Sequence, residues 1–310
     1  MRDINPRVDI AFKKIFGIEE NKDLLISLIN SIVGEADQVT DVTLLNPYNP
    51  KNFREDKLSI LDVKATGSDG KRFNIEIQVN DEADYDKRAL YYWAKLYSEQ
   101  LKSTQDYNKL CKAIGIHILN FTSIPDVKKY HNVFHITEKE NGMLYFKDLE
   151  LHTIELKKFI DTARERKEEL ENMMLKVKDA LDLWTAFLIR YDLINTKKLL
   201  KGLDGSSVEK AIGVIEVMNF TEEERDAYEG RLKWLRIQAS ALKKAEMEAE
   251  ARGEARGEAR GEARGEARGI QKGIDIRNID IAKNMLQKGH DIKLIQDITG
   301  LPQETIEQQN

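Results

Sequence analysis

The pattern of apolar and polar side chains in residues 58–79 constrains the fold of this 310-residue chain more than any other stretch. They read LSILDVKATGSDGKRFNIEIQV. From residue 73 onward apolar and polar side chains alternate, which places the two kinds on opposite faces of a strand. The Gly, Ser and Asp between the halves are typical of a tight turn. The sequence therefore predicts a β-hairpin in which Glu76 and Gln78 share one face.

The first half of the hairpin carries a carboxylate, Asp62, on a face that begins with Leu58 and Ile60. A carboxylate in apolar surroundings is costly to desolvate unless a positive group compensates it. Either Lys64, on the same face, or a bound cation supplies that charge. An amphipathic strand with a solvated polar face explains the second half without any chemistry, so the pattern alone leaves both interpretations open.

Three motifs follow one another in the first 120 residues. They are DIAFKKIFG at residues 9–17, DVKA at 62–65 with EIQ fourteen residues after its Asp, and RALYYWAKLYSEQL at 88–101. In order and spacing they resemble the recombination-promoting nuclease (Rpn) or putative transposase family. This is a bacterial branch of the PD-(D/E)XK nuclease superfamily, in the variant where Gln replaces the Lys of the E-x-K half.

The resemblance implies a site for Mg²⁺ or Mn²⁺, cations that favour oxygen ligands. Its implied ligands are Asp62, Glu76 and the backbone carbonyl of Ile77. Asp9 is a further implied ligand from the first helix, and a role as a helix cap explains that residue equally well.

The resemblance also implies catalytic and DNA-binding roles. Gln78 stands where the wider superfamily has Lys, so it orients water or phosphate by hydrogen bonds but supplies neither a charge nor a proton. Lys64 is the candidate for the missing positive charge. Arg88, Tyr92 and Lys95 are expected to contact the DNA backbone, and a solvated helix face accounts for them equally well.

Two classes of function stay open. The first is a Mg-dependent endonuclease that hydrolyses phosphodiester bonds of double-stranded DNA in recombination, transposition or defence. The second is a non-catalytic DNA- or protein-binding module that keeps the nuclease-like fold and uses a C-terminal oligomerisation element. The net charge of −5 argues against a protein that coats nucleic acid by bulk charge.

The periodicities predict an α/β chain whose elements follow the order α-α-β-β-β-α-β by residue 120. With one additional N-terminal helix, this order matches the restriction-endonuclease-like PD-(D/E)XK core, αβββαβ with a mixed sheet, that the resemblance implies. The expected core elements are helices at 9–16 and 21–33, a strand near 38–45, the hairpin, a helix at 85–101 and a strand at 113–119. Further strands are expected at 133–137 and 148–156. The expected domains are a nuclease-like domain (1–156), a helical region (157–249), a repeat linker (250–273) and a small helical module (274–310).

Residues 250–269 are five consecutive copies of Glu-Ala-Arg-Gly. Each Gly costs about 1 kcal/mol relative to Ala in a helix interior, and the like charges fall four residues apart. Two interpretations remain: a flexible spacer, or a helix stabilised by a partner helix that supplies opposite charges and packs on the Gly stripe. We favour the spacer or a partly helical stalk.

Residues 274–310 regain helical periodicity. A helix ending at Gly289, a second capped by Asp291 and a third with Pro302 at its first position give helix-turn-helix spacing. The third helix, PQETIEQQN, contains two Glu and neither Lys nor Arg, so it would repel phosphate. We therefore expect a small helical module that self-associates or docks on its own nuclease-like domain. Pairing of two copies of the chain as a homodimer is the simpler option.

The cysteine content and the hydropathy of the sequence bear on the redox state and the cellular location of the protein. The lone Cys111, in CKAIGIHIL, is expected to be a small buried core residue, and one cysteine excludes an internal disulfide. The sequence has neither an apolar run of membrane-spanning length nor a signal-peptide pattern at its start. The expectation is a cytoplasmic protein without a membrane partner.

Overall fold

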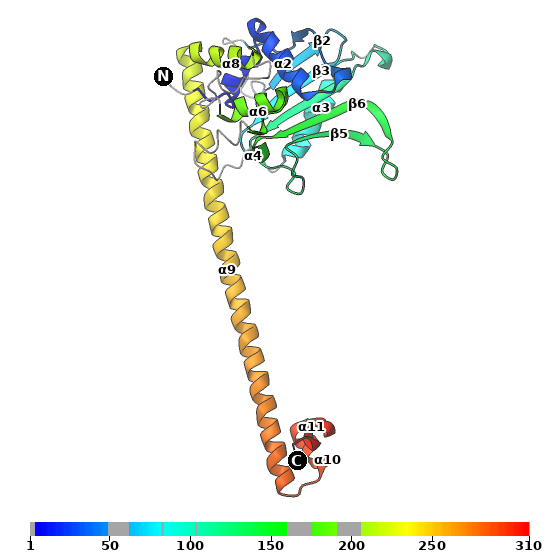
Figure 1. The fold of residues 1–310 in the computed structure, drawn as a ribbon, viewed down its shortest axis with the longest axis vertical. Helices are drawn as coiled ribbons and strands as arrows, with labels where there is room; N and C mark the ends of the chain where they lie inside the picture. The colour runs from blue at the N-terminus through cyan, green and yellow to red at the C-terminus, as the bar shows by residue number, and fades with distance from the viewer. Residues whose placement is uncertain are drawn as a thin grey trace. The chain divides into compact units, whose positions relative to one another are not determined.

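The computed structural model describes residues 4–48, 62–81, 84–102, 104–159, 175–190 and 206–309 (Figure 1). The start of the predicted hairpin, residues 58–61, lies outside these ranges. The chain divides into two structural units, Met1–Ala239 and Ser240–Asn310. Among the described residues, no helix is both long enough and apolar enough to cross a membrane.

A six-stranded mixed sheet forms the centre of the first unit. In chain order its strands are β1 (Val42–Leu44), β2 (Asp62–Gly67), β3 (Arg72–Gln78), β4 (Ala113–Leu119), β5 (His131–Thr137) and β6 (Leu144–Glu155). Their order in space is β1-β2-β3-β4-β6-β5, with β4 parallel to both β3 and β6 and the other neighbours antiparallel. The predicted mixed sheet and α/β class are confirmed.

The main apolar core lies on one face of this sheet. Among the described helices, the contributors to it are α1 (Asp9–Phe16), α2 (Lys22–Ile32), α4 (Leu156–Phe159), α6 (Ala180–Arg190) and α8 (Ser206–Val217). The predicted strand at 113–119 is confirmed as β4, and every one of its residues is buried. Ile114, Ile116 and Ile118 of β4 point into the main core, so a nearly continuous apolar strand predicted a central position correctly.

Helix α3 (Tyr85–Ser98) covers the opposite face. The spacing of Leu90, Trp93, Tyr97 and Leu101 in the sequence predicts a stripe that packs on the sheet. This prediction is wrong in part, because Leu90 is 56 % exposed. Trp93 and Tyr97 are half-buried and use their polar atoms: Trp93 Nε1 donates to the carbonyl of Ala113 (2.8 Å) and the Tyr97 hydroxyl donates to Asp148 (2.8 Å). The sheet face under α3 is polar, so aromatic residues with hydrogen-bonding atoms fit it better than Leu90.

The prediction that Cys111 is a core residue is wrong. It precedes β4 and is half-buried in the loop that packs on the turn between β2 and β3. The side chain of Gln100 bonds its backbone N–H (2.9 Å) and C=O (2.8 Å). A Cβ on Gly70, whose φ is +87°, would lie 2.8 Å from the Cys111 sulfur, so glycine is required there by both conformation and space.

Thr221 and Glu224 have capping-box spacing in the sequence, which predicts a helix start there, and α9 (Glu222–Gln287) begins at this position. The backbone N–H of Thr221 donates to Glu224 Oε2 (2.8 Å), and the N–H of Glu224 donates to Thr221 Oγ1 (3.3 Å). Glu224 also accepts bonds from Lys14 Nζ (2.7 Å) and the Tyr48 hydroxyl (2.6 Å). The beginning of α9 is thereby attached to the first unit.

The second unit contains the later part of α9, α10 (Ile292–Thr299) and α11 (Gln303–Glu307). The expectation of a flexible or partly helical repeat is wrong, because residues 250–269 are helical throughout within α9. The predicted end at Gly289 is confirmed, and its φ of +75° shows why glycine ends that helix. A small core of Ala282, Ile295 and Ile306 joins the three helices.

Candidate active site

The polar residues of β3 lie under α3 and are withdrawn from solvent. Asn74, Glu76 and Gln78 are only 1 %, 1 % and 4 % exposed. The alternative of a solvated polar face is therefore wrong. Phe73 and Ile75, on the other face of the same strand, belong to the main core, so β3 is buried on both sides. Burying polar groups costs free energy, and this cost marks the face as a candidate site.

Glu76 is at the centre of this buried polar face. Gln78 Nε2 donates a hydrogen bond to Glu76 Oε1, and Arg88 Nη2 lies 3.6 Å from the same oxygen. His117 Nδ1 lies 3.7 Å from Glu76 Oε2. The site thus combines β3, the neighbouring strand β4 and helix α3 around one carboxylate.

Asp62 is the backbone partner of Glu76 in the β2–β3 register. Directly opposed positions of an antiparallel pair lie on the same face of a sheet. The side chain of Asp62 is outside the described part of the structure. The register therefore brings the two positions of the motif together across the hairpin.

Sequence reasoning gave no role to His117, the register partner of Glu76 on β4. It is 1 % exposed, and its ring packs edge-on against Tyr85 at 5.7 Å between centroids. Gly115 leaves room for it, because a Cβ there would lie 3.2 Å from His117 Nε2. The available signal was a single titratable residue inside an apolar strand.

Burial sets the charge states beside Glu76. It lowers the pKa of His117 to about 4, and the positive charge of Arg88 acts in the same direction, so the imidazole is neutral at neutral pH. Burial also raises the pKa of Tyr85, and the negative charge of Glu76 raises it further. At neutral pH His117 is therefore neutral and Tyr85 keeps its proton, so neither adds a formal charge beside Glu76.

Several buried polar atoms on this face have no hydrogen-bond partner among the described residues. They are Thr66 Oγ1, Arg72 Nε, Asn74 Oδ1, Asn80 Nδ2, the Tyr85 hydroxyl, His117 Nδ1 and Thr153 Oγ1. Buried polar groups nearly always find a partner, so their concentration under α3 fits a layer that receives polar ligands, ions or water.

The other residues predicted for the metal site and for catalysis, Lys64, Ile77 and Asp9, have separate environments. Lys64 is half-buried in β2 and its backbone N–H donates to Asn46 Oδ1 (2.8 Å). Ile77 points its side chain into the main core. Asp9 forms an ion pair with Arg231 of α9 (3.1 Å). Burial raises the pKa of Asp9, although the positive charge of Arg231 acts in the opposite direction. The helix-cap alternative for Asp9 is wrong, since the cap position of α1 is Val8 and carries no side-chain bond.

The three residues expected to bind DNA do not share one environment. Arg88 is turned toward Glu76 under the helix. Tyr92 is half-buried, with its ring 5.7 Å from that of Tyr91. Lys95 is exposed and lies 3.5 Å from Glu99 in the next turn.

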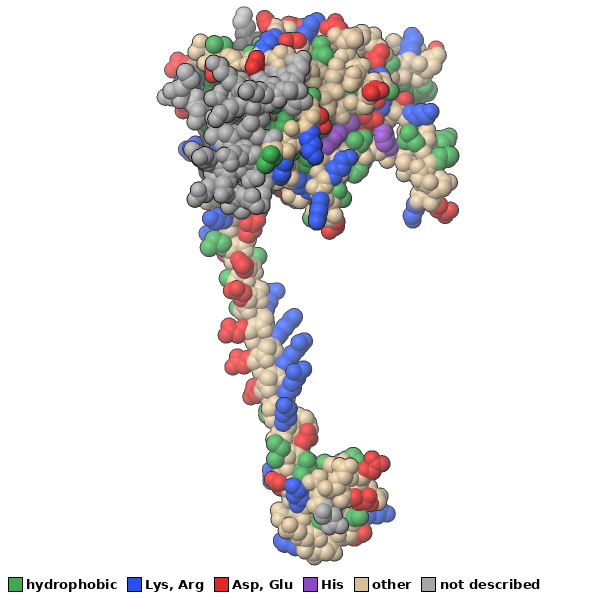
Figure 2. Space-filling model, in the orientation of Figure 1, with side chains coloured by type: hydrophobic (Ala, Val, Ile, Leu, Met, Phe, Trp, Pro, Cys, Tyr) green, Lys and Arg blue, Asp and Glu red, His purple; other side chains and the backbone are tan. Residues whose placement is uncertain are grey.

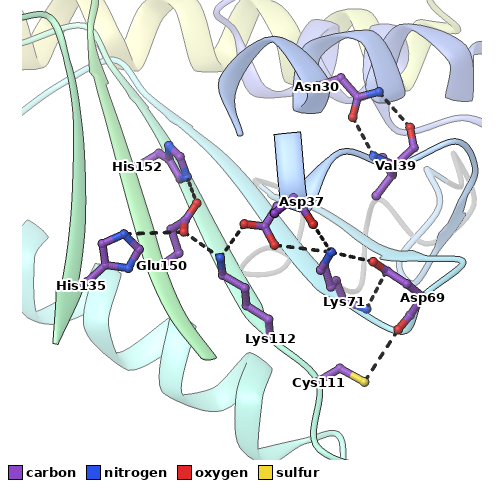
Figure 3. Close-up of polar contacts among 11 residues, drawn as sticks. Asn30, Asp37, Val39, Asp69, Lys71, Cys111, Lys112, His135, Glu150 and His152 are labelled. Atoms are coloured by element: carbon purple, nitrogen blue, oxygen red, sulfur yellow. Dashed lines mark hydrogen bonds and ion pairs between the residues drawn. The ribbon is translucent and has the colours of Figure 1, made fainter. Parts of the chain in front are cut away.

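A second polar cluster, shown in Figure 3, connects separate elements of the first unit. Lys112 Nζ contacts Asp37 (2.6 Å) and Glu150 (2.7 Å), and Lys71 lies 3.4 Å from Asp37. His152 Nε2 is 2.7 Å from Glu150. Burial alone would raise the pKa of Glu150, but the bonds from His152 and Lys112 lower it to about 2. We interpret this cluster as structural, because its charges are mutually compensated.

The buried His117 predicts a loss of stability in acid. Its pKa is about 4 in the folded chain against an ordinary 6.5, so the unfolded chain takes up the proton first as the pH falls. The contribution is complete above pH 6.5 and is lost between pH 6.5 and 4, on the order of 3 kcal/mol in all. Denaturant unfolding at neutral pH and near pH 4.5 should show a smaller pH effect in His117→Asn. The exposed His290→Asn is the matched control, and an equal pH effect in all three chains would contradict the prediction.

Comparison with known proteins agrees with this architecture. Residues 6–245 match the family model described as PD-(D/E)XK nuclease family transposase. No curated protein and no solved structure matches the chain significantly. The matched range includes the hairpin, α3, β4 and the helices that complete the core. The chain therefore belongs to the PD-(D/E)XK nuclease family transposases.

Proposed function

We propose that the chain is a metal-dependent endonuclease that hydrolyses phosphodiester bonds of double-stranded DNA in recombination, transposition or defence. The observation that carries this proposal is the carboxylate of Glu76, buried under α3 and surrounded by Gln78, Arg88 and His117. Family membership supports a nuclease-like activity. Cleavage of supercoiled plasmid that requires added Mg²⁺ or Mn²⁺ is the test.

The residues present fit a hard divalent cation. Asp62 and Glu76 are opposed in register, and the backbone carbonyl of Ile77 lies between Glu76 and Gln78 in β3. Among the described side chains no group of three carboxylates, imidazoles or thiols could hold a metal, a statement that does not extend to Asp62. Asp9 would have to leave Arg231 to join them. When bound, Mg²⁺ or Mn²⁺ supplies a more acidic water and neutralises charge on the phosphate.

We assign the other roles at the site to Gln78, Lys64 and Arg88. Gln78 presents a neutral amide at the position beside Glu76, so it orients a water or a phosphate oxygen without donating charge. Lys64 follows Asp62 by two residues on the same face of β2, opposite Asn74, and we assign it the compensating positive charge. Arg88 compensates Glu76 from α3.

DNA is proposed to approach over α3. Lys95 is exposed, which suits a contact with the phosphate backbone, while Tyr92 is half-buried beside it. Arg88 reaches phosphate only by turning away from Glu76, so its DNA-binding role is proposed for the substrate complex.

Gln78 offers a separate prediction. Gln78→Lys should remain active, because an amine also donates hydrogen bonds from this position. Gln78→Ala should lose much of the rate, about tenfold to a hundredfold, because the group that orients water or phosphate is absent. The measurement is the initial rate of plasmid nicking at saturating Mg²⁺. Equal rates for Gln78→Ala and the parent would remove Gln78 from the chemistry.

A non-catalytic DNA- or protein-binding module is the second candidate. It is favoured by the contacts already made by Glu76, whose charge is compensated by Arg88 and whose oxygen accepts a bond from Gln78. The candidates differ in one observable, since only the nuclease converts supercoiled plasmid to nicked or linear product.

We also propose that the helical module at residues 274–310 pairs two copies of the chain. Ile276, Leu294 and Ile298 of this module are 62 %, 45 % and 57 % exposed although a small core is formed beside them. A chain ending at Ala249 should therefore be monomeric and should cut duplex DNA less efficiently with its metal site intact. Light scattering provides the mass, and equal masses for the full and shortened chains would refute the module's role.

A further inference from the structure

The Glu-Ala-Arg-Gly repeat presents two opposite charged sides. Residues 250–269 are helical and exposed throughout. Glu and Arg are two positions apart, and each residue of an α-helix advances about 100°, so the two types lie about 200° apart around the axis. Figure 2 shows the acidic side chains along one side of this helix and the basic side chains along the other.

Most of these charges form no ion pair with a described residue of their own chain. Among the described residues, Arg252 is 3.8 Å from Glu248, just before the repeat. No ion pair is made by the eight charged residues that follow: Glu254, Arg256, Glu258, Arg260, Glu262, Arg264, Glu266 and Arg268. Neighbours four positions apart carry like charges, which destabilise a single helix. A partner that offers opposite charges on both sides would remove this repulsion.

We propose that the partner is the same helix of a second copy, lying parallel. In a parallel pair related by a twofold axis, the left flank of one helix meets the right flank of the other. Because one flank is Glu and the other is Arg, both contacts are between opposite charges. In an antiparallel pair equal flanks meet, so Glu would face Glu and Arg would face Arg.

The balance of charge favours a second copy over nucleic acid. The repeat contains five Glu and five Arg, so its net charge is zero, and a phosphate backbone along the Arg side would leave the Glu side unpaired. A second copy uses both sides at once. The period of four exceeds 3.6 residues per turn, so the stripes drift and the two helices must coil in the right-handed sense to follow them.

Charge exchange in the full chain tests the proposal. An acidic variant changes Arg256, Arg260, Arg264 and Arg268 to Glu, and a basic variant changes Glu254, Glu258, Glu262 and Glu266 to Arg. A control makes both sets of changes together and so keeps the two opposite stripes. Sedimentation equilibrium at low salt should show self-association weakened at least tenfold in each single-sign variant, near-parental association in the control, and association restored when the acidic and basic variants are mixed.

Orientation is tested with spin labels. Labelled Ala251→Cys and Ala267→Cys, each in a Cys111→Ser background, should both give short distances between copies in a parallel pair. An antiparallel pair would hold equal positions apart by up to about 24 Å at these two ends. Unchanged association in the single-sign variants, a mixture that stays monomeric while the control pairs, or antiparallel distances would each overturn the inference. A parent that is itself monomeric would overturn both this inference and pairing through residues 274–310.

Discussion

Replacing Glu76 with alanine is expected to reduce metal-dependent DNA cleavage about a thousandfold or more, because the substitution removes the one described carboxylate buried at the proposed site. Asp62→Ala should have a comparable effect, since its position opposes Glu76 across the hairpin. One carboxylate alone is a weak site for a strongly hydrated cation. The measurement is the initial rate of plasmid nicking at several Mg²⁺ concentrations.

Two controls separate lost chemistry from lost folding. Glu76→Gln keeps the side-chain volume and removes the charge, so it should be equally inactive, and denaturant unfolding of the same preparation shows whether it is folded under the assay conditions. Glu140→Ala changes an exposed glutamate in the loop between β5 and β6 and should keep full activity. Full activity in Glu76→Ala or Asp62→Ala would remove these residues from the reaction.

Replacing Trp184 with alanine is expected to lower the free energy of unfolding by about 3–5 kcal/mol. Trp184 of α6 is 1 % exposed, and its ring lies edge-on to Phe16 of α1 (5.3 Å) and Phe187 (5.6 Å). Its Nε1 also donates to Ser27 of α2 (3.2 Å). The loss is large because the residue connects the later helical region with the N-terminal helices in one core.

Denaturant unfolding of the parent, Trp184→Ala and Tyr107→Ala checks this expectation. Tyr107 is 82 % exposed, so the same kind of truncation there should change stability by less than about 0.5 kcal/mol. A small effect at Trp184 would mean that α6 contributes little to the stability of the sheet domain.

The hairpin could be predicted because a period of two is a property of the sequence itself. The alternation at Glu76 and Gln78 identified both faces of β3 correctly. It could not show that the polar face is covered, since that depends on how α3 is rotated about its axis. The sequence likewise does not show whether Trp93 and Tyr97 pack through their rings alone. In the structure each of them also donates a hydrogen bond.

The neighbourhood of Glu76 depended on contacts that are distant in sequence. His117 lies next to Glu76 only because β4 runs parallel to β3, and Arg88 reaches it only because α3 crosses that face. A motif on one strand carries no information about either neighbour. The match of Asp9 to the family's opening motif likewise did not reveal its partner, Arg231, which comes from a helix more than two hundred residues later.

The sequence predicted the helix ends in the second unit, whereas it did not predict that the repeat is helical. Gly289 and Gly300 adopt positive φ, and this requirement is visible in the sequence as glycine after an apolar period. The repeat is helical although glycine and like charges at four-residue spacing oppose a helix. Single-chain propensities therefore gave the wrong expectation for it.

Metal-dependent cleavage of DNA at Glu76 is the central element of the proposed function. The decisive measurement incubates supercoiled plasmid with the purified full chain, first in EDTA and then across a titration of Mg²⁺ or Mn²⁺, beside Glu76→Gln under the same conditions. We expect no nicking in EDTA, nicking by the parent that rises with the cation concentration and saturates, and no nicking by Glu76→Gln. Equal nicking in EDTA, or equal cleavage by the parent and Glu76→Gln, would contradict the proposed function.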